Sequence, residues 1–480
     1  MKKVAIIGAG PAGLSAAYEL LSKSDEYQVT IYEKDFIVGG LSKTYEFEGG
    51  RVDVGGHRFF TKNEYVWKLW NEILPKGKNG MLVRERKSHI LWNSKLITYP
   101  IELSVETIKT LGFVTGMNTI LSYLFTKFQS RTTDNLEDFY IKHFGNELYK
   151  DFFKDYTYKL WGLPASSISS DWGRQRIRKV SLGQLVHSIF KIRKGENEEE
   201  RSLIKKFYYP AYGSGQLWEM LEKNIIELGG NVEKNCYVDR LVLNNLKITE
   251  VEYIKDGERY KKKYDFVFSS MPLNELVESI DNVPLNVQDI SNRLRYRDMI
   301  IVAMALHVDY MSSMYKKVQK DSWIYIQDTR FKCGRIQILN NWSPYAARVE
   351  DQVLLELELF CDKNEYLWNL SNSELLELSI NELIKCDICS SAARISSYIV
   401  KRIEKAYPIY IDGYYQLDDV KNWINRIDNL FCIGRNGQHR YNNMDHSVET
   451  GIEAARSIMR GSIDRKRVWT VNTKEEYLEK

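Results

Sequence analysis

Val4-Ala-Ile-Ile-Gly8-Ala-Gly10-Pro-Ala-Gly13 opens the chain with a short apolar run that leads directly into three spaced glycines. Residues 14–21 have helical composition, and residues 28–32 form a second β-branched run that ends at Glu33. Pro11 suits the first turn of a helix because that position needs no backbone donor. A strand, a glycine turn, a helix and a second strand ending in a carboxylate about 20 residues later predict a dinucleotide-binding βαβ unit.

The glycines predict where the phosphates of such a dinucleotide bind. Gly8, Gly10 and Gly13 leave room for a pyrophosphate at the helix N-terminus, where unpaired N–H groups and the helix dipole favour negative charge. Glu33 would accept hydrogen bonds from both hydroxyls of an adenosine ribose. The alternative is a glycine turn that only packs the helix against the strand, and the spacing of Glu33 disfavours it.

Further glycine pairs extend this pattern at both ends of the chain. Gly39-Gly40-Leu41 and Gly55-Gly56-His57 fit a long dinucleotide whose second half needs close backbone contact. Residues 430–433 predict another parallel strand running into Gly434-Arg435, with a helix expected from Asp445 to residue 456. Asp445 could cap that helix. We expect the two ends to share one domain.

This pattern resembles the glutathione-reductase-like FAD proteins, in the branch of the amine oxidases and protoporphyrinogen oxidases. The resemblance implies an α/β fold, with a Rossmann FAD-binding domain, a helical insertion and an antiparallel-sheet substrate domain. It also implies that FAD is the cofactor. The implied cofactor-binding residues are Gly8, Gly10, Gly13, Glu33, Gly40, Leu41, Gly56, His57, Val238, Gly434, Arg435, Met444 and Asp445.

Composition between the two ends supports this organisation, and the length of 480 residues predicts about three domains or lobes. Residues 105–190 are helical in character and residues 299–400 are strand-rich, with strands expected at 299–306, 322–326 and 353–360. The last alternates and predicts a half-buried antiparallel strand. The expected FAD-binding domain is built from residues 1–75, 205–275 and 425–480, the mainly helical substrate or cap region from 76–204, and the antiparallel-sheet domain from 276–424.

Charge and cysteine usage exclude several classes of function. The net charge of +4 gives no reason to expect a nucleic-acid partner, and the charge run at 194–201 predicts a solvated loop. Cys386 and Cys389 form one CxxC pair without nearby histidines, so we expect neither a metal site nor a disulfide framework. The N-terminus lacks a signal-peptide apolar region, and residues 111–125 are too short to span a bilayer. A cytoplasmic location without a transmembrane segment is expected.

Three segments in chain order resemble one family of this branch, the UDP-galactopyranose mutases. Residues 56–63, Gly-His-Arg-Phe-Phe-Thr-Lys-Asn, are similar to that family's GxHxFxTN segment. Residues 156–162, Tyr-Thr-Tyr-Lys-Leu-Trp-Gly, resemble its YTxKxWG segment, and residues 440–445, Arg-Tyr-Asn-Asn-Met-Asp, resemble its RYxxMD segment. The resemblance covers nearly the whole chain.

The resemblance implies isomerisation of a nucleotide sugar between pyranose and furanose forms, as in cell-surface polysaccharide biosynthesis. Reduced flavin acts there through N5 as a nucleophile, and a diphosphate departs and returns. Carried over, Tyr156 would stack on uracil and Trp161 would line the sugar pocket. The implied catalytic residues are Arg176, His57 and Tyr441, and the implied substrate-binding residues are Tyr156, Trp161, Arg176, Tyr407 and Tyr441.

One departure keeps the substrate open. The family places a second diphosphate arginine at the end of a strand, whereas the strand expected at 299–306 ends in His307. Arg295, Arg297 and Arg335 are the possible substitutes. The alternative function is an FAD-dependent oxidoreductase of the amine oxidase or protoporphyrinogen oxidase type. Tyr156 and Trp161 could instead be core aromatic residues, and Arg176 could belong to a solvated basic stretch.

Overall fold

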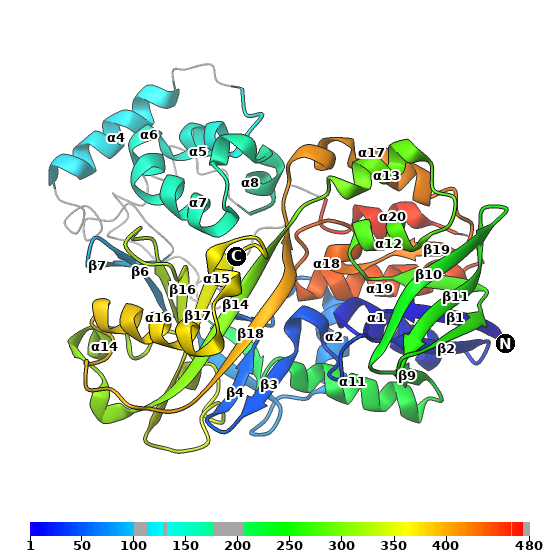
Figure 1. Ribbon diagram of the computed structural model, residues 1–480, viewed down its shortest axis with the longest axis horizontal. Helices are drawn as coiled ribbons and strands as arrows, with labels where there is room; N and C mark the ends of the chain where they lie inside the picture. Colours follow the sequence, from blue (N-terminus) through cyan, green and yellow to red (C-terminus); the bar gives the residue numbers. More distant parts are fainter. Residues whose placement is uncertain (100–112, 128–131, 177–205, 462, 474–480) are drawn as a thin grey trace.

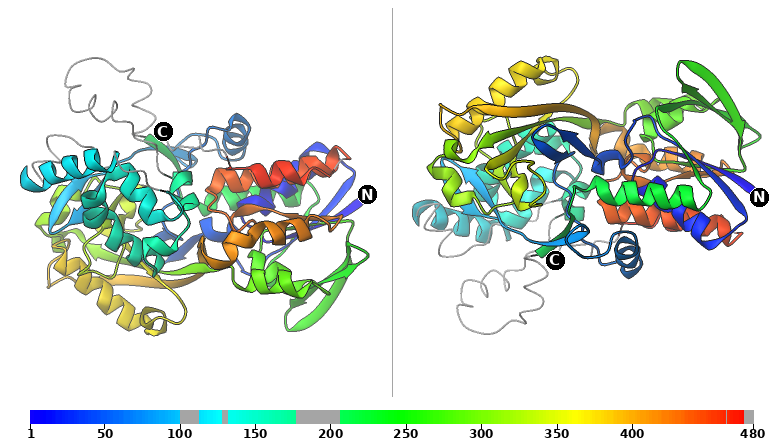
Figure 2. Two further views of the ribbon diagram at one scale, coloured as in Figure 1. Left: turned by 90° about the horizontal axis from the view of Figure 1, so that it is seen from above. Right: turned by 90° about the horizontal axis from the view of Figure 1, so that it is seen from below.

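The computed structural model describes residues 1–99, 113–127, 132–176, 206–461 and 463–473 (Figure 1). The molecule has two halves, each built around a sheet. Strands β14 (Tyr296–His307) and β18 (Ile395–Pro408) are long and run from one half towards the other. The two halves lie side by side along the long axis of the molecule, and the helices α4–α8 cover one end of the second half (Figure 2).

The first half contains a five-stranded parallel sheet with the order β19-β13-β1-β2-β9. Its strands are β1 (Lys2–Ile7), β2 (Tyr27–Tyr32), β9 (Asn231–Glu233), β13 (Phe266–Ser269) and β19 (Leu430–Cys432). The strands come from the start, the middle and the end of the chain, so both ends of the chain contribute to this one sheet. Buried apolar runs such as Val4–Ile7 suit such a sheet because both of its faces are covered.

Different elements cover the two faces of the parallel sheet. The helices α1 (Pro11–Lys23), α11 (Gly215–Glu227) and α19 (Met444–Met459) lie on one face, where Leu14, Leu217 and Val448 join one apolar core. A three-stranded antiparallel sheet lies on the other. Its strands are β10 (Cys236–Asn244), β11 (Lys247–Lys255) and β12 (Glu258–Lys263). The fold is therefore the expected α/β class, with a Rossmann-like half.

The second half contains a seven-stranded sheet with the order β18-β14-β17-β16-β15-β6-β7. Besides β14 and β18, its strands are β6 (Ser88–Trp92), β7 (Lys95–Thr98), β15 (Trp323–Ile326), β16 (Arg335–Ile338) and β17 (Gln352–Cys361). All neighbouring pairs are antiparallel except β15 with β6. The three expected strands lie within β14, β15 and β17.

One expectation about this sheet is wrong. The alternation over 353–360 predicts a strand with one solvated face, but β17 is buried on both faces. Glu356 and Glu358 are fully buried. Polar side chains on neighbouring strands, Gln337 and Arg335, take the place of solvent as their partners. The alternating pattern therefore marks an internal polar layer rather than a surface.

The region expected as a mainly helical cap begins with strands. Residues 76–204 contribute β5 (Met81–Glu85), β6 and β7 before the helices, and β6 and β7 join the seven-stranded sheet. The helices that follow are α4 (Phe113–Lys127), α5 (Leu136–Phe144), α6 (Asn146–Leu148), α7 (Asp155–Trp161) and α8 (Ser170–Arg176). The charge run at 194–201 lies outside the described residues.

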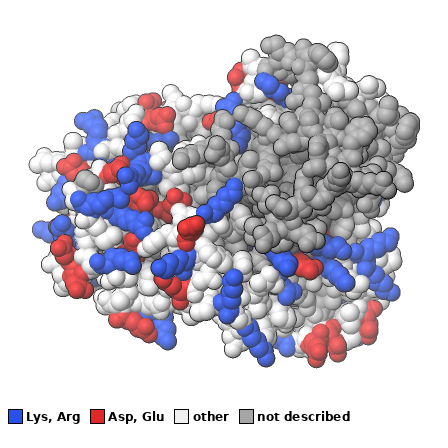
Figure 3. Space-filling model, turned by 180° about the vertical axis from the view of Figure 1, so that it is seen from behind, with Lys and Arg blue, Asp and Glu red and all other residues white. Residues whose placement is uncertain are grey.

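The surface carries both signs of charge. On the face shown in Figure 3, basic and acidic side chains of the described residues are interspersed. Among the helices that the structure describes, none combines the length and the apolar character that a bilayer crossing requires.

Candidate active site

The loop after β1 forms a glycine turn at the position where the sequence predicts phosphate binding. Gly8 has a φ of +98°, which suits glycine, and Pro11 begins α1 directly after Gly10. The Glu33 carboxylate lies beside this turn and accepts hydrogen bonds from the N–H groups of Ala9 (2.7 Å) and Asp35 (2.9 Å). Burial raises the pKa of Glu33. The βαβ unit therefore presents a buried carboxylate next to a glycine-lined helix N-terminus.

Gly10 and Gly40 lie close together and form a narrow slot, which bears on whether the site fits an extended dinucleotide. A Cβ added to Gly40 would lie 3.1 Å from Cα of Gly10, which is tighter than most contacts of a Cβ atom, so the close approach of the two backbones depends on Gly40 lacking a side chain. Gly40 begins a short 3₁₀ helix that continues through Leu41, and Leu41 lines the cavity described below. The glycines leave backbone groups exposed to a pyrophosphate, and the slot leads towards the cavity. The glycines of this turn therefore fit the FAD that the sequence predicts.

Val238 lies near the ribose-binding end of this site. The N–H of Cys236, the first residue of β10, donates to the carbonyl of Glu33 (2.8 Å). Val238 is two residues further along the same strand and is buried. Its assignment as a cofactor-binding residue stays a prediction.

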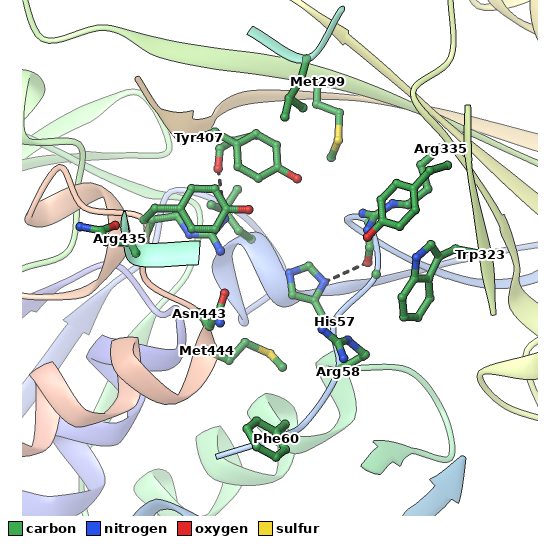
Figure 4. A pocket seen from close by; sticks show the side chains of 18 of the residues that line it. His57, Arg58, Phe60, Met299, Trp323, Arg335, Tyr407, Arg435, Asn443 and Met444 are labelled. Carbon is green, nitrogen blue, oxygen red and sulfur yellow. Dashed lines mark hydrogen bonds between the residues drawn. The ribbon is translucent and has the colours of Figure 1, made fainter. Parts of the chain in front are cut away.

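A cavity of about 390 Å³ adjoins the slot and lies between the two halves of the molecule (Figure 4). It brings together most of the residues that the sequence motifs single out. Those lining it are Leu41, Gly56, His57, Tyr156, Trp161, Tyr407, Arg435, Tyr441, Met444 and Asp445. Figure 4 shows His57 near the middle, with Arg335 and Trp323 on one side and Arg435 on the other.

His57 is held as a neutral imidazole. Its Nδ1 lies 2.9 Å from the carbonyl oxygen of Gly55, so Nδ1–H donates to that carbonyl and Nε2 is left as an acceptor. Burial and the neighbouring charge of Arg435 lower the pKa of His57 to about 3. At neutral pH this residue can accept a hydrogen bond in the cavity but does not supply a proton.

Four aromatic rings form one wall of the cavity. Trp161 contacts Trp172 edge to face, with ring centroids 5.5 Å apart, and Trp172 contacts Tyr441 in the same way at 6.5 Å. Tyr407 stacks on Tyr441 at 5.6 Å, and the guanidinium of Arg435 lies 4.8 Å from the centroid of the Tyr441 ring. The motif residues Trp161, Tyr407 and Tyr441 therefore pack with one another and also line the cavity.

Three arginines could replace the missing strand arginine, and the structure places one of them at the cavity. Arg335, at the start of β16, lines the cavity and pairs with Glu358, its Nε lying 2.9 Å from Oε2. Arg297 is buried away from the cavity and donates to the carbonyls of Leu160 (3.0 Å) and Phe360 (3.1 Å). Arg295 also lies outside the residues that line the cavity. Of the three, Arg335 alone can face a ligand there.

The structure describes the position of Asp445 but not the side chain of Arg176. Asp445 is the second residue of α19, and Asn443 is the N-cap residue, so the alternative in which Asp445 only caps the helix is excluded. The backbone N–H of Asn443 donates to Nδ1 of His446 (3.2 Å), which closes the helix start without Asp445. Arg176 is the last residue of α8, and its side chain lies outside the described part of the chain.

Several cavity residues have no counterpart in the sequence prediction. They are Arg58, Arg86, Tyr99, Lys206, Trp323 and Tyr325. They come from segments that are far apart in the sequence, so no local spacing connects them. Of these six residues, only Arg58 could have been identified from the sequence, because it directly follows His57 within a recognised motif.

Lys159, in the middle of the 156–162 motif, has a structural role. Its Nζ donates to the carbonyl of Ile326 at the end of β15 (2.7 Å) and to the carbonyls of Asp328 (2.8 Å) and Cys333 (3.2 Å) in the connection between β15 and β16. Burial lowers the pKa of Lys159. The motif lysine thus joins α7 to the sheet, which fixes Tyr156 and Trp161 at the cavity.

Replacing Lys159 with methionine should therefore lower the free energy of unfolding by about 2 to 3 kcal/mol, because it leaves three carbonyls without their charged donor. The measurement is urea unfolding of the FAD-loaded protein. Lys150→Met is the matched control, since Lys150 is exposed and makes only a surface pair with Glu147. Equal losses in the two variants would contradict the assigned role of Lys159.

A layer of buried acids lies behind Gly55 and Gly56. Glu356 accepts from Gln337 Nε2 (3.2 Å), and that amide also donates to Glu358 (2.9 Å). Burial, and then the charge of Glu358, raise the pKa of Glu356, while burial raises the pKa of Asp53 to about 6. Arg335 is the cation that faces this layer.

Glu356 should make the protein less stable as the pH rises. A carboxyl whose pKa is raised by folding contributes stability below its unfolded pKa of about 4.3, and this contribution is lost as the pH rises through the folded value. Glu356→Gln cannot titrate, so its melting temperature should exceed that of the wild type at pH 9 and approach it at pH 5. Glu350→Gln, at an exposed position, should show no such trend. Parallel curves of melting temperature against pH for all three proteins would contradict the raised pKa of Glu356.

Comparisons with known proteins agree with this geometry. A family model for an NAD(P)-binding Rossmann-like domain matches residues 6–73. Protoporphyrinogen oxidase 2, chloroplastic/mitochondrial, from Arabidopsis thaliana is 30% identical over 156 residues. That match spans 31% of this chain and 30% of the oxidase, so it covers less than a third of that relative.

Solved structures extend the similarity to the whole chain. A reduced UDP-galactopyranose mutase aligns with a TM-score of 0.83 and 21% identity over 98% of this chain and 99% of the mutase. Cyclohexylamine oxidase from Brevibacterium oxydans IH-35A aligns with a TM-score of 0.63 and 13% identity over 96% and 99%. These identities establish the architecture and not the reaction. The chain shares the fold of these two solved enzymes.

Proposed function

We propose that this chain is an FAD-dependent enzyme that isomerises a nucleotide sugar between its pyranose and furanose forms. The observation that carries the proposal is the lining of the cavity next to the glycine slot. It combines the aromatic motif residues Tyr156, Trp161, Tyr407 and Tyr441 with a strong excess of basic side chains. These basic residues are Arg58, Arg86, Lys206, Arg335 and Arg435, whereas Asp445 is the carboxylate among the described lining residues.

This lining favours an anionic substrate with a flat ring. Arginine binds phosphate through paired N–H donors, and its attraction to a diphosphate increases as charge develops on a departing phosphate. The rings of Tyr156 and Tyr325 offer surfaces for a nucleobase, and Trp161 lies deeper, against Tyr407. A cationic amine would meet repulsion in the same cavity.

The residues of the chain divide the work between cofactor and substrate. Gly8, Gly10, Gly13, Glu33 and Gly40 would hold the adenosine and pyrophosphate part of FAD, and the residues at the start of α19 would lie along the flavin. When bound, reduced FAD supplies an electron-rich nitrogen next to the sugar. His57 offers Nε2 as an acceptor near that position, while the hydroxyl groups of Tyr407 and Tyr441 are candidates to bind the departing diphosphate.

The direct test uses the holoenzyme reduced with dithionite and supplied with UDP-galactopyranose. We expect a furanose product, separable by anion-exchange chromatography, and no net oxidation of the sugar. The oxidised enzyme serves as the control and should be inactive. No product from the reduced enzyme with any of several UDP-sugars would refute the proposal.

The second candidate is an FAD-dependent oxidoreductase of the amine oxidase or protoporphyrinogen oxidase type. The 30% identity to protoporphyrinogen oxidase 2 over part of the chain favours it. The basic cavity would suit the carboxylates of a porphyrinogen better than an amine. Stoichiometric hydrogen peroxide formed from a porphyrinogen, with no reaction in the reduced-enzyme sugar assay, would establish this function instead. A cytoplasmic location and the absence of a nucleic-acid partner stay predictions from the sequence.

A further inference from the structure

Strand β18 contains a strained residue directly before the part of the strand that lines the cavity. Lys405 has a φ of +52°, in the left-handed region that a lysine rarely adopts and that glycine adopts freely. The next two residues, Ala406 and Tyr407, line the cavity, and Figure 4 shows the Tyr407 ring reaching into it. Strain of this kind persists only where surrounding contacts hold it, so the contacts of Lys405 bear on how Tyr407 is placed.

The strained residue lies in a bulge where β18 pairs with β14. Arg297 pairs with Tyr407, and beyond Asp298 the register changes by two residues, so residues 404–406 lie opposite Asp298 alone. If the pairing of the rest of the strand continued without this change, Lys405 would lie opposite Arg297. A bulge alters which side chain a strand presents at a given place, and this one places Tyr407 there instead.

The Asp298 carboxylate binds the backbone at the bulge. Its Oδ1 accepts the N–H of Lys405 at 2.6 Å, and its Oδ2 accepts the N–H of Lys363, just after β17, at 3.2 Å. Asp298 is buried, and burial raises its pKa. A carboxylate is a strong acceptor for a backbone N–H. Asp298 therefore holds the strained residue directly, from the strand that faces it.

The first half of the molecule holds the same bulge through its carbonyl groups. In α18 (Gly434–Gly437), Nδ2 of Asn436 donates to the carbonyl of Lys405 at 2.8 Å. Nη1 of the adjacent Arg435 donates to the carbonyl of Ala406 at 3.2 Å. The two residues that precede the cavity tyrosine are thus bound from both halves of the molecule.

We infer that the bulge at Lys405 positions Tyr407 for substrate binding. Asp298 and Asn436 act through the bulge as positioning residues. The inference rests on the proposed function, in which the Tyr407 hydroxyl binds the departing diphosphate. Tyr407 stacks on Tyr441, with ring centroids 5.6 Å apart and 13° between the ring planes. A relaxed bulge would move the Tyr407 ring along β18 and separate the two rings.

The test measures UDP binding to the FAD-loaded protein by calorimetry. Tyr407→Phe should weaken UDP binding roughly 10- to 100-fold, because a hydrogen bond to a charged phosphate is lost. Asp298→Ala should cause a similar loss at unchanged FAD content, since the released backbone no longer holds Tyr407 in place. Combining the two changes should add little to either loss, because both remove the same contact.

A glycine at position 405 distinguishes the strained backbone from other effects of losing Asp298. Glycine adopts this φ without strain, so Asp298→Ala in the Lys405→Gly background should lower UDP affinity by no more than about threefold. Lys405→Gly alone is the reference for that comparison, since it also removes the ion pair with Glu275 in α12 (Leu273–Ser279). Asp309→Ala is the matched control for Asp298→Ala, because Asp309 lies just beyond the other end of β14 and is exposed.

Three results would overturn the inference and leave the proposed function standing. They are wild-type UDP affinity in Asp298→Ala, wild-type UDP affinity in Tyr407→Phe, and a loss in Asp298→Ala that Lys405→Gly does not diminish. If Asp298→Ala does not retain FAD, Asn436→Ala releases the bulge from its carbonyl side, with the same expected loss and the same recovery. A wild-type holoenzyme that does not bind UDP would overturn the proposed function and the inference together.

Discussion

Gly13→Ala should yield a protein that retains almost no FAD and is less stable by at least about 3 kcal/mol. A Cβ at position 13 would lie 2.0 Å from the carbonyl oxygen of Gly8 and 3.1 Å from Cγ2 of Ile6. The nearer atom is backbone, so no change of rotamer relieves the contact, and α1 must move away from β1. That movement opens the phosphate-binding turn. The measurement is the ratio of flavin to protein absorbance after gel filtration, together with thermal unfolding.

Gly10→Ala separates cofactor binding from folding. Its Cβ would lie 3.6 Å from Cα of Gly40, which is an ordinary contact, so the apoprotein should fold with near wild-type stability. The added methyl group would nevertheless enter the slot expected to hold the pyrophosphate, and FAD affinity should fall. If Gly10→Ala keeps full FAD content while Gly13→Ala loses it, the slot between Gly10 and Gly40 is not the pyrophosphate site.

The dinucleotide-binding unit could be predicted from the sequence because its determinants are local. Glycine spacing, Pro11 and Glu33 all act within one strand, turn, helix and strand, and the structure reproduces this order from β1 to β2. The start of α19 could also be predicted from the sequence, to within about one residue. The outcome for Asp445 shows the limit of such reasoning, since Asn443 and Asp445 are both suitable capping residues and only the backbone geometry selects Asn443, which pairs with His446.

The walls of the cavity could not be predicted in the same way because tertiary pairing creates them. Arg335 and Glu358 are cross-strand partners only because β16 and β17 pair in one particular register. In the sequence, Arg297 is an equally plausible ligand residue, yet the turn after α7 and the end of β17 enclose it. Likewise, Tyr99 and Trp323 meet through Tyr325 only after β15 has paired in parallel with β6. Long-range register therefore determined the part of the site that the motifs missed.

Arg335→Met should destabilise the folded protein by about 3 to 5 kcal/mol, because it leaves the Glu358 carboxylate buried without its cationic partner. Gln337 would remain as a single amide donor at 2.9 Å, which does not balance a charge. Urea unfolding of the FAD-loaded protein, monitored by circular dichroism, gives the free energy.

Changing both partners distinguishes the charge effect from the loss of packing. Arg335→Met combined with Glu358→Leu replaces the ion pair with apolar groups of similar size, and the double variant should recover most of the stability lost in the single variant. Because Arg335 lines the cavity, the double variant also tests its part in binding. If Arg335 is not a ligand of the diphosphate, because Glu358 already balances its charge, UDP affinity in the recovered double variant should stay within about threefold of wild type, well short of the loss of one charge-assisted bond. A double variant that is stable but no longer binds UDP would assign the diphosphate to Arg335, and Glu358 would then act by positioning that arginine.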